Sequence, residues 1–539
     1  MLSTGTRLIS CSRAHRSLSL SRPRHLTSSL TARKQEKGNK KNTILNPPEP
    51  SDKWNYNRSS LFDPSPTDYS TFKRVTSNDL AKEISPPRNV KMLARDFIED
   101  SLYNPNYGYF SKKATIFDWS EKPFNFEDIR DATEFDSLVA DRYASYDAGK
   151  QLWHTPTELF KPWYGQAIAQ CLVSEYLLKY FPYEDFIIYE IGAGNGTLAL
   201  NILDYLRSNY PEVYDRTRYT IIEISASLAN KQKARLCKAH PAVHVVHKSI
   251  FHWTNREAAP CFFLSMEVID NFAHDVIRYN LDTLEPYQGL VTVDKNGEFD
   301  MIYTPIDDPL IASFLQLRTR LKHPLPISPV FQKAPFLRKL YRNLPFAANL
   351  SGEEYIPTRL LSLIRTLRDR FPRHRLLLSD FSSLKDTVPG VSAPVVQTRV
   401  RGTTIPCETL LVHQGSFDIF FPTDFERLRD MYEHVLSQPT NNLRRSAESV
   451  VPDRSTPLTP TTYSLSLGSG FFSSSASIAN RRTPLDGVAS ASGLPVGEHK
   501  SSVFTHAEFL ETYADLGRTR LKNGENPMLD FYKNVKFLF

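Results

Sequence analysis

Three glycines on alternate positions form the stretch of this chain that is best suited to bind a small ligand. Gly192, Gly194 and Gly196 lie in YEIGAGNGTLAL, directly after an apolar run and directly before a helix-like one. Glycine adopts positive φ readily and has no Cβ, so a ligand can approach the backbone closely. A strand, a glycine turn and a helix place such a ligand at the carboxyl end of a sheet, over a helix N-terminus.

The spacing of these glycines narrows the choice of ligand. Dinucleotide-binding proteins use G-x-G-x-x-G, but Thr197 stands where that pattern needs its third glycine, and no Gly-Lys-Ser/Thr follows to make a P-loop. Two acids end the neighbouring apolar runs, Glu190 just before the turn and Glu223 within YTIIEI. A carboxylate can pair with an ammonium group and can accept hydrogen bonds from a vicinal diol.

The glycine turn, with an acid at the end of the next strand, resembles the first motifs of class I S-adenosylmethionine (SAM) methyltransferases. The resemblance implies that Gly192, Gly194 and Gly196 bind SAM. It further implies that Glu190 lies near the methionine amino group and that Glu223 binds the ribose hydroxyls. A Rossmann-like sheet that binds another cofactor, or none, remains the alternative.

Short apolar strands that alternate with helices must position this turn. Such strands are typical of a parallel sheet covered on both faces. We therefore expect an α/β fold, a Rossmann-like class I methyltransferase sheet with helices on both faces, plus an N-terminal helical segment and inserted capping elements. In the N-terminal helix, Val90, Leu93, Phe97 and Ile98 are expected to share a face. We expect strands at 186–191, 219–224, 243–247, 261–266 and 375–381, helices at 164–180, 197–207, 227–238 and 357–370, and a hairpin at 286–305.

The composition is that of a soluble protein, and the first 35 residues have the pattern of an import signal. The mean hydropathy is −0.38, and no run approaches the roughly 20 apolar residues of a membrane-spanning helix. Much of the net charge of +7 comes from residues 1–35, which hold seven Lys or Arg and no acid. This pattern predicts a mitochondrial transit peptide rather than a nucleic-acid-binding surface, with an ordinary basic tail as the alternative. Five scattered cysteines without a C-x-x-C pair indicate neither a zinc site nor a disulfide framework.

Several ordered segments between residues 89 and 435 resemble motifs of the MidA-like methyltransferases, a family that includes an arginine methyltransferase of mitochondrial complex I assembly. Three departures are Met266, where the family usually has Asn, Asn271-Phe272, where it has Ala-Leu, and Ser382, where it has the Gly of D-Y-G. The resemblance implies a matrix enzyme that methylates arginine, of the symmetric type, in a protein subunit of respiratory complex I, without a metal. The segments are SLYNPNYGYF (101–110), HTPTELFKPWYG (154–165), IIEISASLANKQKARL (221–236), SMEVIDNFAHDVIRY (265–279), SDFSS (379–383) and GSFDIFFPTDF (415–425).

Two acids just past the fourth expected strand are the candidates for holding an arginine acceptor. A guanidinium is always protonated in water, so carboxylates must orient it. Glu267 and Asp270 share a face if a helical turn begins there, because they are spaced i, i+3. We expect Glu267 to contact the guanidinium and Asp270 to assist. For Asp270 a capping or loop role is equally open, and His274 is expected to be structural rather than a base.

Two other functions remain open alongside an arginine methyltransferase. One is a SAM-binding assembly factor without catalysis, and the other is a small-molecule methyltransferase. The expected division of the chain is a transit peptide (1–35), a linker arm (36–88), the methyltransferase domain (89–435) with insertions near 118–150 and 306–356, a disordered Ser/Pro-rich insertion (436–502), and a C-terminal segment that docks on the catalytic domain (503–539).

Overall fold

The computed structural model divides the chain into two units, Met1–Asn55 and Tyr56–Phe539. All described residues belong to the second unit. The expected transit peptide, most of the linker arm and most of the Ser/Pro-rich insertion lie outside the described residues. The structure describes residues 69–112, 122–144, 155–345, 347–400, 403–438 and 500–539.

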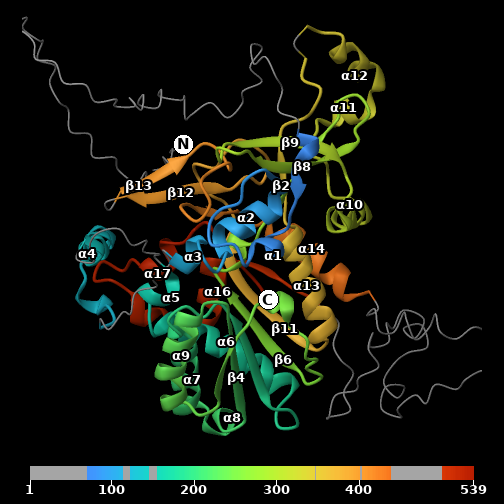
Figure 1. Ribbon diagram of the computed structural model, residues 1–539. Coiled ribbons are helices and arrows are strands. Elements are labelled where there is room, and N and C mark those ends of the chain that lie inside the picture. Colours follow the sequence, from blue (N-terminus) through green and yellow to red (C-terminus); the bar gives the residue numbers. More distant parts are fainter. Residues whose placement is uncertain (1–68, 113–121, 145–154, 346, 401–402, 439–499) are drawn as a thin grey trace, which may run out of the picture. The chain divides into compact units, whose positions relative to one another are not determined.

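A seven-stranded sheet forms the centre of this unit, in the order β15-β16-β11-β6-β3-β4-β5 (Figure 1). The five strands from β11 to β5 are parallel, and β16 pairs antiparallel with both β11 and β15. The expected α/β class is confirmed. The strands are β3 (Phe186–Ile191), β4 (Thr217–Glu223), β5 (Val243–His247), β6 (Cys261–Met266), β11 (His374–Phe381), β15 (Val503–Thr505) and β16 (Val535–Leu538).

Helices cover both faces of this sheet. Successive side chains of each strand point to opposite faces, and since both sets are apolar, both faces must be covered. On β3, Phe186 and Ile188 belong to one core cluster, and Ile187 and Tyr189 belong to another. The first face is covered by α6 (Trp163–Lys179), α7 (Thr197–Asn209), α9 (Ala226–Ala239) and α16 (His506–Tyr513), and the second by α13 (Thr358–Arg370) and α14 (Phe425–Leu436).

A second sheet of six strands combines β1 and β2, which precede β3 in the chain, with strands that follow β6. Its order is β1-β2-β8-β7-β10, with β9 paired to β8. The expected hairpin is the antiparallel pair β8 and β9. A three-stranded sheet has the order β13-β12-β14. These strands are β1 (Lys73–Arg74), β2 (Val90–Leu93), β7 (Asp275–Tyr279), β8 (Pro286–Val293), β9 (Phe299–Pro305), β10 (Glu354–Ile356), β12 (Val395–Val400), β13 (Thr403–Cys407) and β14 (Asp418–Phe420).

The N-terminal helix begins later than the sequence predicts. Residues Val90–Leu93 form strand β2, which pairs antiparallel with β8, and helix α2 covers Ala94–Tyr103. The prediction that Val90 and Leu93 share a helical face with Phe97 is therefore wrong. The apolar spacing fits both a strand and a helix here, and pairing with a distant strand decided between them.

The remaining helices lie between and beside the strands of these sheets in the chain. Residues 306–356, expected as a capping excursion, contain α10 to α12 and strand β10. Among the described residues, no helix has both the length and the apolar character needed to cross a membrane. These helices are α1 (Ser77–Leu80), α3 (Tyr109–Lys112), α4 (Ala132–Ala144), α5 (Pro156–Leu159), α8 (Pro211–Tyr214), α10 (Pro309–Leu321), α11 (Pro329–Lys333), α12 (Pro335–Arg342) and α17 (Pro527–Asp530).

Candidate active site

The glycine turn joins β3 to α7 and has positive φ at all three glycines, 65° at Gly192, 55° at Gly194 and 75° at Gly196. A Cβ on Gly196 would lie 2.7 Å from Cδ1 of Leu236 on α9. A Cβ on Gly192 would lie 3.0 Å from Cγ2 of Val268, in the loop after β6. The turn therefore packs closely between α9 and that loop, and positive φ makes a side chain at either position strained.

Glu190 is buried on β3, on the face covered by α6 and α7. The Tyr219 hydroxyl on β4 donates a hydrogen bond of 2.8 Å to Oε2 of Glu190. Burial raises the pKa of Glu190 to about 7, and the Tyr219 hydrogen bond partly offsets this. Within the described part of the chain no partner is found for Oε1, so a cationic ligand group can pair with it.

Glu223 ends β4, and its carboxylate is held in place by two donors. Ser225 N donates to Oε1 at 2.9 Å, and Gln232 Nε2 donates to Oε2 at 3.0 Å. Gln232 also donates to the Gly194 carbonyl at 2.8 Å. A single side chain of α9 thus links the glycine turn to the acid of the next strand. The sequence analysis missed Gln232, although the family pattern for residues 221–236 carries a Gln at this position.

Glu267 directly follows β6 and has φ of +54°. Its backbone N–H donates to the Ser379 carbonyl of β11 at 2.9 Å. Burial and the charge of Asp380 raise the pKa of Glu267 well above its ordinary value. Positive φ is unfavourable for a residue with a Cβ, and such conformations cluster at functional sites where the surrounding structure enforces them.

Asp270 lies in a 3₁₀ turn (Ile269–Asn271), and Asp380 at the end of β11 caps that turn. Asp380 Oδ2 accepts from Ile269 N at 3.0 Å and from Asp270 N at 3.1 Å. The cap of this turn therefore belongs to Asp380. Asp270 Oδ1 accepts a hydrogen bond of 2.8 Å from the Asn271 N–H, as a loop acid would, so both roles left open for Asp270 stay predictions. No helical turn begins at Glu267, because Glu267 precedes the 3₁₀ turn in a left-handed conformation, so the condition for the two acids to share a helical face is not met.

Three carboxylates thus meet where β6 and β11 end. Among the described residues, no ion pair with Lys or Arg is found for Glu267, Asp270 or Asp380. Burial, followed by the charge of Asp380, raises the pKa of Asp270 well above its ordinary range. Burial raises the pKa of Asp380 to about 7. A bound cation would offset this uncompensated charge and would lower all three pKa values.

His274 follows the turn, and it is neutral. Its Nδ1–H donates to the Phe272 carbonyl at 2.8 Å, and its ring stacks on Phe421 with 3.8 Å between centroids. Burial lowers its pKa to about 4. It lines a groove of about 700 Å³, open to solvent, whose other walls include Leu360 and Met431. None of the residues predicted to bind SAM or the acceptor lines this groove.

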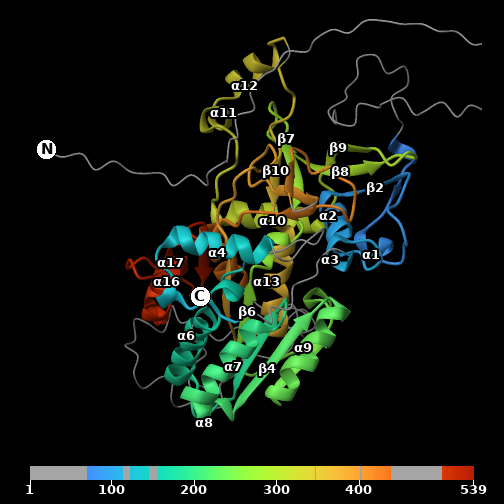
Figure 2. The same ribbon diagram turned by 90° about the vertical axis from the view of Figure 1, so that its left-hand side faces the viewer.

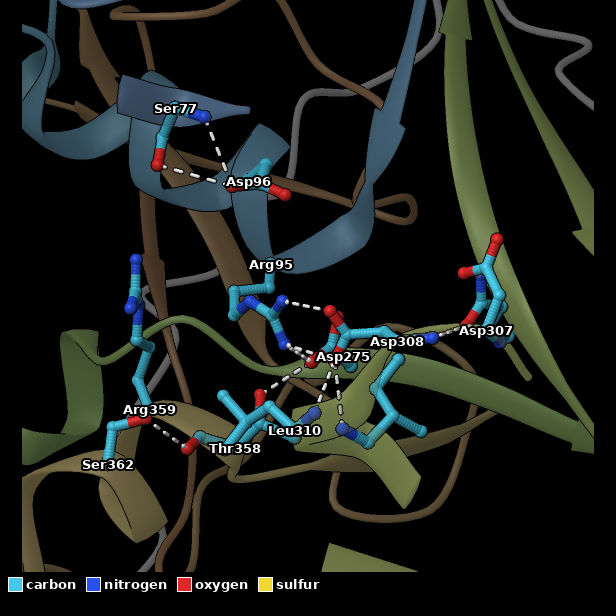
Figure 3. Close-up of polar contacts among 12 residues, drawn as sticks. Ser77, Arg95, Asp96, Asp275, Asp307, Asp308, Leu310, Thr358, Arg359 and Ser362 are labelled. Atoms are coloured by element: carbon cyan, nitrogen blue, oxygen red, sulfur yellow. Dashed lines mark hydrogen bonds and ion pairs between the residues drawn. The ribbon is translucent and has the colours of Figure 1, made fainter. Parts of the chain in front are cut away.

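A buried ionic network fixes the strand that follows the turn (Figure 3). Arg95 on α2 donates to Asp275 at 2.6 Å and to Asp308 at 2.8 Å. Thr358 on α13 donates to the same Asp275 oxygen at 2.6 Å. Asp275 begins β7 and is five positions past Asp270. The network therefore anchors the start of β7, five residues past Asp270, to α2 and α13.

Two departures from the family pattern have structural partners. Ser382 donates from both its N–H and its hydroxyl to the Asn534 carbonyl, which ties the end of β11 to the C-terminal segment. Asn271, in place of the usual Ala, donates to Asp418 at 3.1 Å and to the Ile419 carbonyl. Nothing in the structure explains Met266.

These features together define a class I SAM-dependent methyltransferase. The carboxyl ends of parallel strands β3, β4, β6 and β11 meet at one edge, which carries the glycine turn, Glu223 and the three acids. The turn packs closely against Leu236 and Val268, and it lies over the N-terminus of α7. In the described ranges no group of three His, Cys, Asp or Glu is arranged to hold a metal.

Comparison with known proteins gives the family. Residues 167–441 match the model of the family described as "Putative S-adenosyl-L-methionine-dependent methyltransferase", and the chain belongs to it. A relative from Schizosaccharomyces pombe, named mitochondrial protein arginine methyltransferase NDUFAF7 homolog, is 27% identical over 57% of this chain and 67% of its own length. Its counterpart of the same name from Saccharomyces cerevisiae is 22% identical over 52% of this chain and 68% of its length.

The names of both relatives confirm the expected mitochondrial localisation. Among solved structures, a protein from Burkholderia thailandensis with bound S-adenosyl-homocysteine is similar over 70% of this chain and 80% of its own. Its TM-score is 0.41 and its sequence identity is 16%.

Proposed function

We propose that this methyltransferase transfers the methyl group to an arginine of a protein. The observation that carries the proposal is the group of three acids at the ends of β6 and β11, which has no basic partner among the described residues. A guanidinium bound there offsets the charge and forms charge-assisted hydrogen bonds. Both relatives are named protein arginine methyltransferases, which supports the same acceptor.

The residues divide into two roles under this proposal. The three glycines, Glu190 and Glu223 hold SAM, which supplies an electrophilic methyl group when bound. Glu267 contacts the guanidinium, and Asp270 assists it. Methyl transfer is an in-line displacement, so these side chains need only align the acceptor and exclude water. The carboxylates also favour charge accumulation on the attacking nitrogen.

The finer features are proposed from the family resemblance. The acceptor is a subunit of respiratory complex I, the product is symmetric dimethylarginine, and the reaction assists assembly of that complex. The same proposal treats 89–435 as the catalytic domain and 503–539 as a segment that completes it. The pairing of β16 with β11 supports this division.

Comparing mitochondrial proteins from cells with and without the gene tests the acceptor. We expect peptides carrying symmetric dimethylarginine, in a complex I subunit, to disappear in the mutant cells and to return with the intact gene. Mass spectrometry of the purified complex measures this. An unchanged arginine-methylation profile beside an assembly defect would instead indicate a SAM-binding assembly factor. Methylation confined to small molecules would contradict a protein acceptor.

A further inference from the structure

Residues 320–345 form a surface that the methyltransferase reaction does not use, here called the basic arm. It contains helices α11 and α12, which extend beyond the edge of the second sheet in both views (Figures 1 and 2). No Asp or Glu occurs anywhere between Asp308 and Glu353. The arm itself carries six basic residues: Arg320, Lys322, Lys333, Arg338, Lys339 and Arg342.

The inner side of the basic arm is anchored to the second sheet. Phe331 and Tyr341 meet edge to face, with 5.5 Å between ring centroids, and Phe331 packs against the core under β8. Arg338 donates to the Asp282 carbonyl at 2.9 Å, and Arg342 pairs with the Asp282 carboxylate at 2.7 Å. These contacts fix which side of α12 faces outward.

The outer side is apolar, although it is exposed. Val330 is 58% exposed, Phe336 69%, Leu340 60% and Leu344 52%. Phe336 and Leu340 are spaced i, i+4, so they lie on one face of α12. Large exposed apolar side chains that cluster in one short segment mark an interaction surface.

Basic side chains flank this apolar patch. Lys333 and Lys339 are exposed, and for neither is an ion pair found among the described residues. A helix with Phe and Leu on one side and Lys or Arg beside them is typical of segments that lie in the interface of an anionic bilayer. There the apolar side chains enter the acyl region and the charges meet the headgroups.

We propose that the basic arm docks this enzyme on an anionic phospholipid surface. A second copy of the chain fits less well, because two arms of the same charge repel each other. A nucleic acid would satisfy the charges but would leave the aliphatic side chains of Val330, Leu340 and Leu344 in water. The lipid surface satisfies both features.

Tryptophan quenching by brominated lipid tests insertion at the arm itself. In the full chain, Leu340→Trp is mixed with brominated phosphatidylcholine vesicles with or without phosphatidylglycerol. We expect added quenching, relative to the parent chain, only with phosphatidylglycerol present. Leu178→Trp is the matched control, because Leu178 is 82% exposed at the far end of α6. Because quenching reports lipid contact at the substituted residue, comparing residue 340 with residue 178 distinguishes insertion of the arm from binding through the N-terminal residues.

Two double variants separate the contribution of the basic side chains to vesicle binding from that of the apolar side chains. Lys333→Gln with Lys339→Gln, and Phe336→Ser with Leu340→Ser, should each weaken the arm-dependent binding about tenfold. Lys231→Gln with Lys233→Gln on α9 should leave it unchanged. Absence of quenching at residue 340, or equal quenching in neutral vesicles, would overturn the proposal. Conversion of a dimer to a monomer by the apolar variant, without a vesicle effect, would assign the arm to a second copy instead.

Discussion

The Asp380 carboxylate accepts a hydrogen bond of 3.1 Å from the backbone N–H of Asp270, although 110 residues separate them. Asp380, at the end of β11, thus holds Asp270 in the turn that follows β6. The Asp380 carboxyl fixes the turn, and after burial its charge is the next cause that raises the pKa of Asp270. The geometry of the acceptor loop and its electrostatics therefore depend on the same contact.

The glycine turn should not tolerate a side chain at residue 196. Gly196→Ala forces a Cβ to within 2.7 Å of Leu236 at a φ of 75°, so the turn must move. We expect SAM affinity to fall by more than about tenfold, because a Cβ at a positive-φ position adds strain. Calorimetric titration measures the affinity. Gly352→Ala, with no atom within 4 Å of its Cβ, should bind SAM normally. Unaltered affinity in Gly196→Ala would contradict the placement of SAM.

Removing the charge of Glu267 should slow methyl transfer without weakening SAM binding. Glu267→Gln keeps the size of the side chain but removes the negative charge, and we expect kcat to fall about 100-fold. The measurement is transfer of labelled methyl from SAM to proteins extracted from mitochondria that lack the enzyme. Asp424→Asn, which alters the cap of α14 and the ion pair with Arg427, serves as the control. A normal rate in Glu267→Gln would remove Glu267 from the acceptor site.

The stability of the protein should fall as the pH rises from about 5 to about 7, partly because of Asp380. Its pKa is raised by burial from 3.8 to about 7. In this window the folded state holds a proton that the unfolded chain has released, so stability decreases with pH, by at most about 1.4 kcal/mol per unit for one proton. Urea unfolding at both pH values should show a smaller decrease in Asp380→Asn. Asp307→Asn, whose pKa is lowered by Arg74, should retain the parental pH dependence. Equal pH dependence in Asp380→Asn and parent would refute the titration.

The buried ion pair behind the acceptor loop should matter far more than an exposed one. Arg95→Met leaves the Asp275 carboxylate buried without its cation, at a cost of about 3–5 kcal/mol. Arg74→Met breaks the exposed pair with Asp307 and should cost less than about 1 kcal/mol. Urea unfolding measures both free energies. Similar values for the two variants would show that Arg95 does not hold the second sheet as described.

Much of the α/β sheet was predictable because its signals are local. The strands at 186–191, 243–247 and 261–266 begin and end where their apolar runs do. The glycine turn was equally visible, since positive φ favours glycine at three alternate positions. SAM binding was implied by the resemblance of this turn, with Glu223 at the end of the next strand, to the class I methyltransferases. Strand β2 was not predictable, because Val90–Leu93 fits a helix until β8 pairs with it.

The arrangement of Glu267, Asp270 and Asp380 was decided by the tertiary structure alone. The sequence by itself placed Glu267 and Asp270 next to a strand end, and it established their chemical type. It did not show that Asp380, contributed by a distant strand, caps their turn, nor that Glu267 has a left-handed backbone. Both depend on the parallel pairing of β6 with β11, which brings segments more than 100 residues apart within hydrogen-bonding distance. Local patterns cannot encode which distant acid arrives there, and that acid determines the charge and geometry of the site.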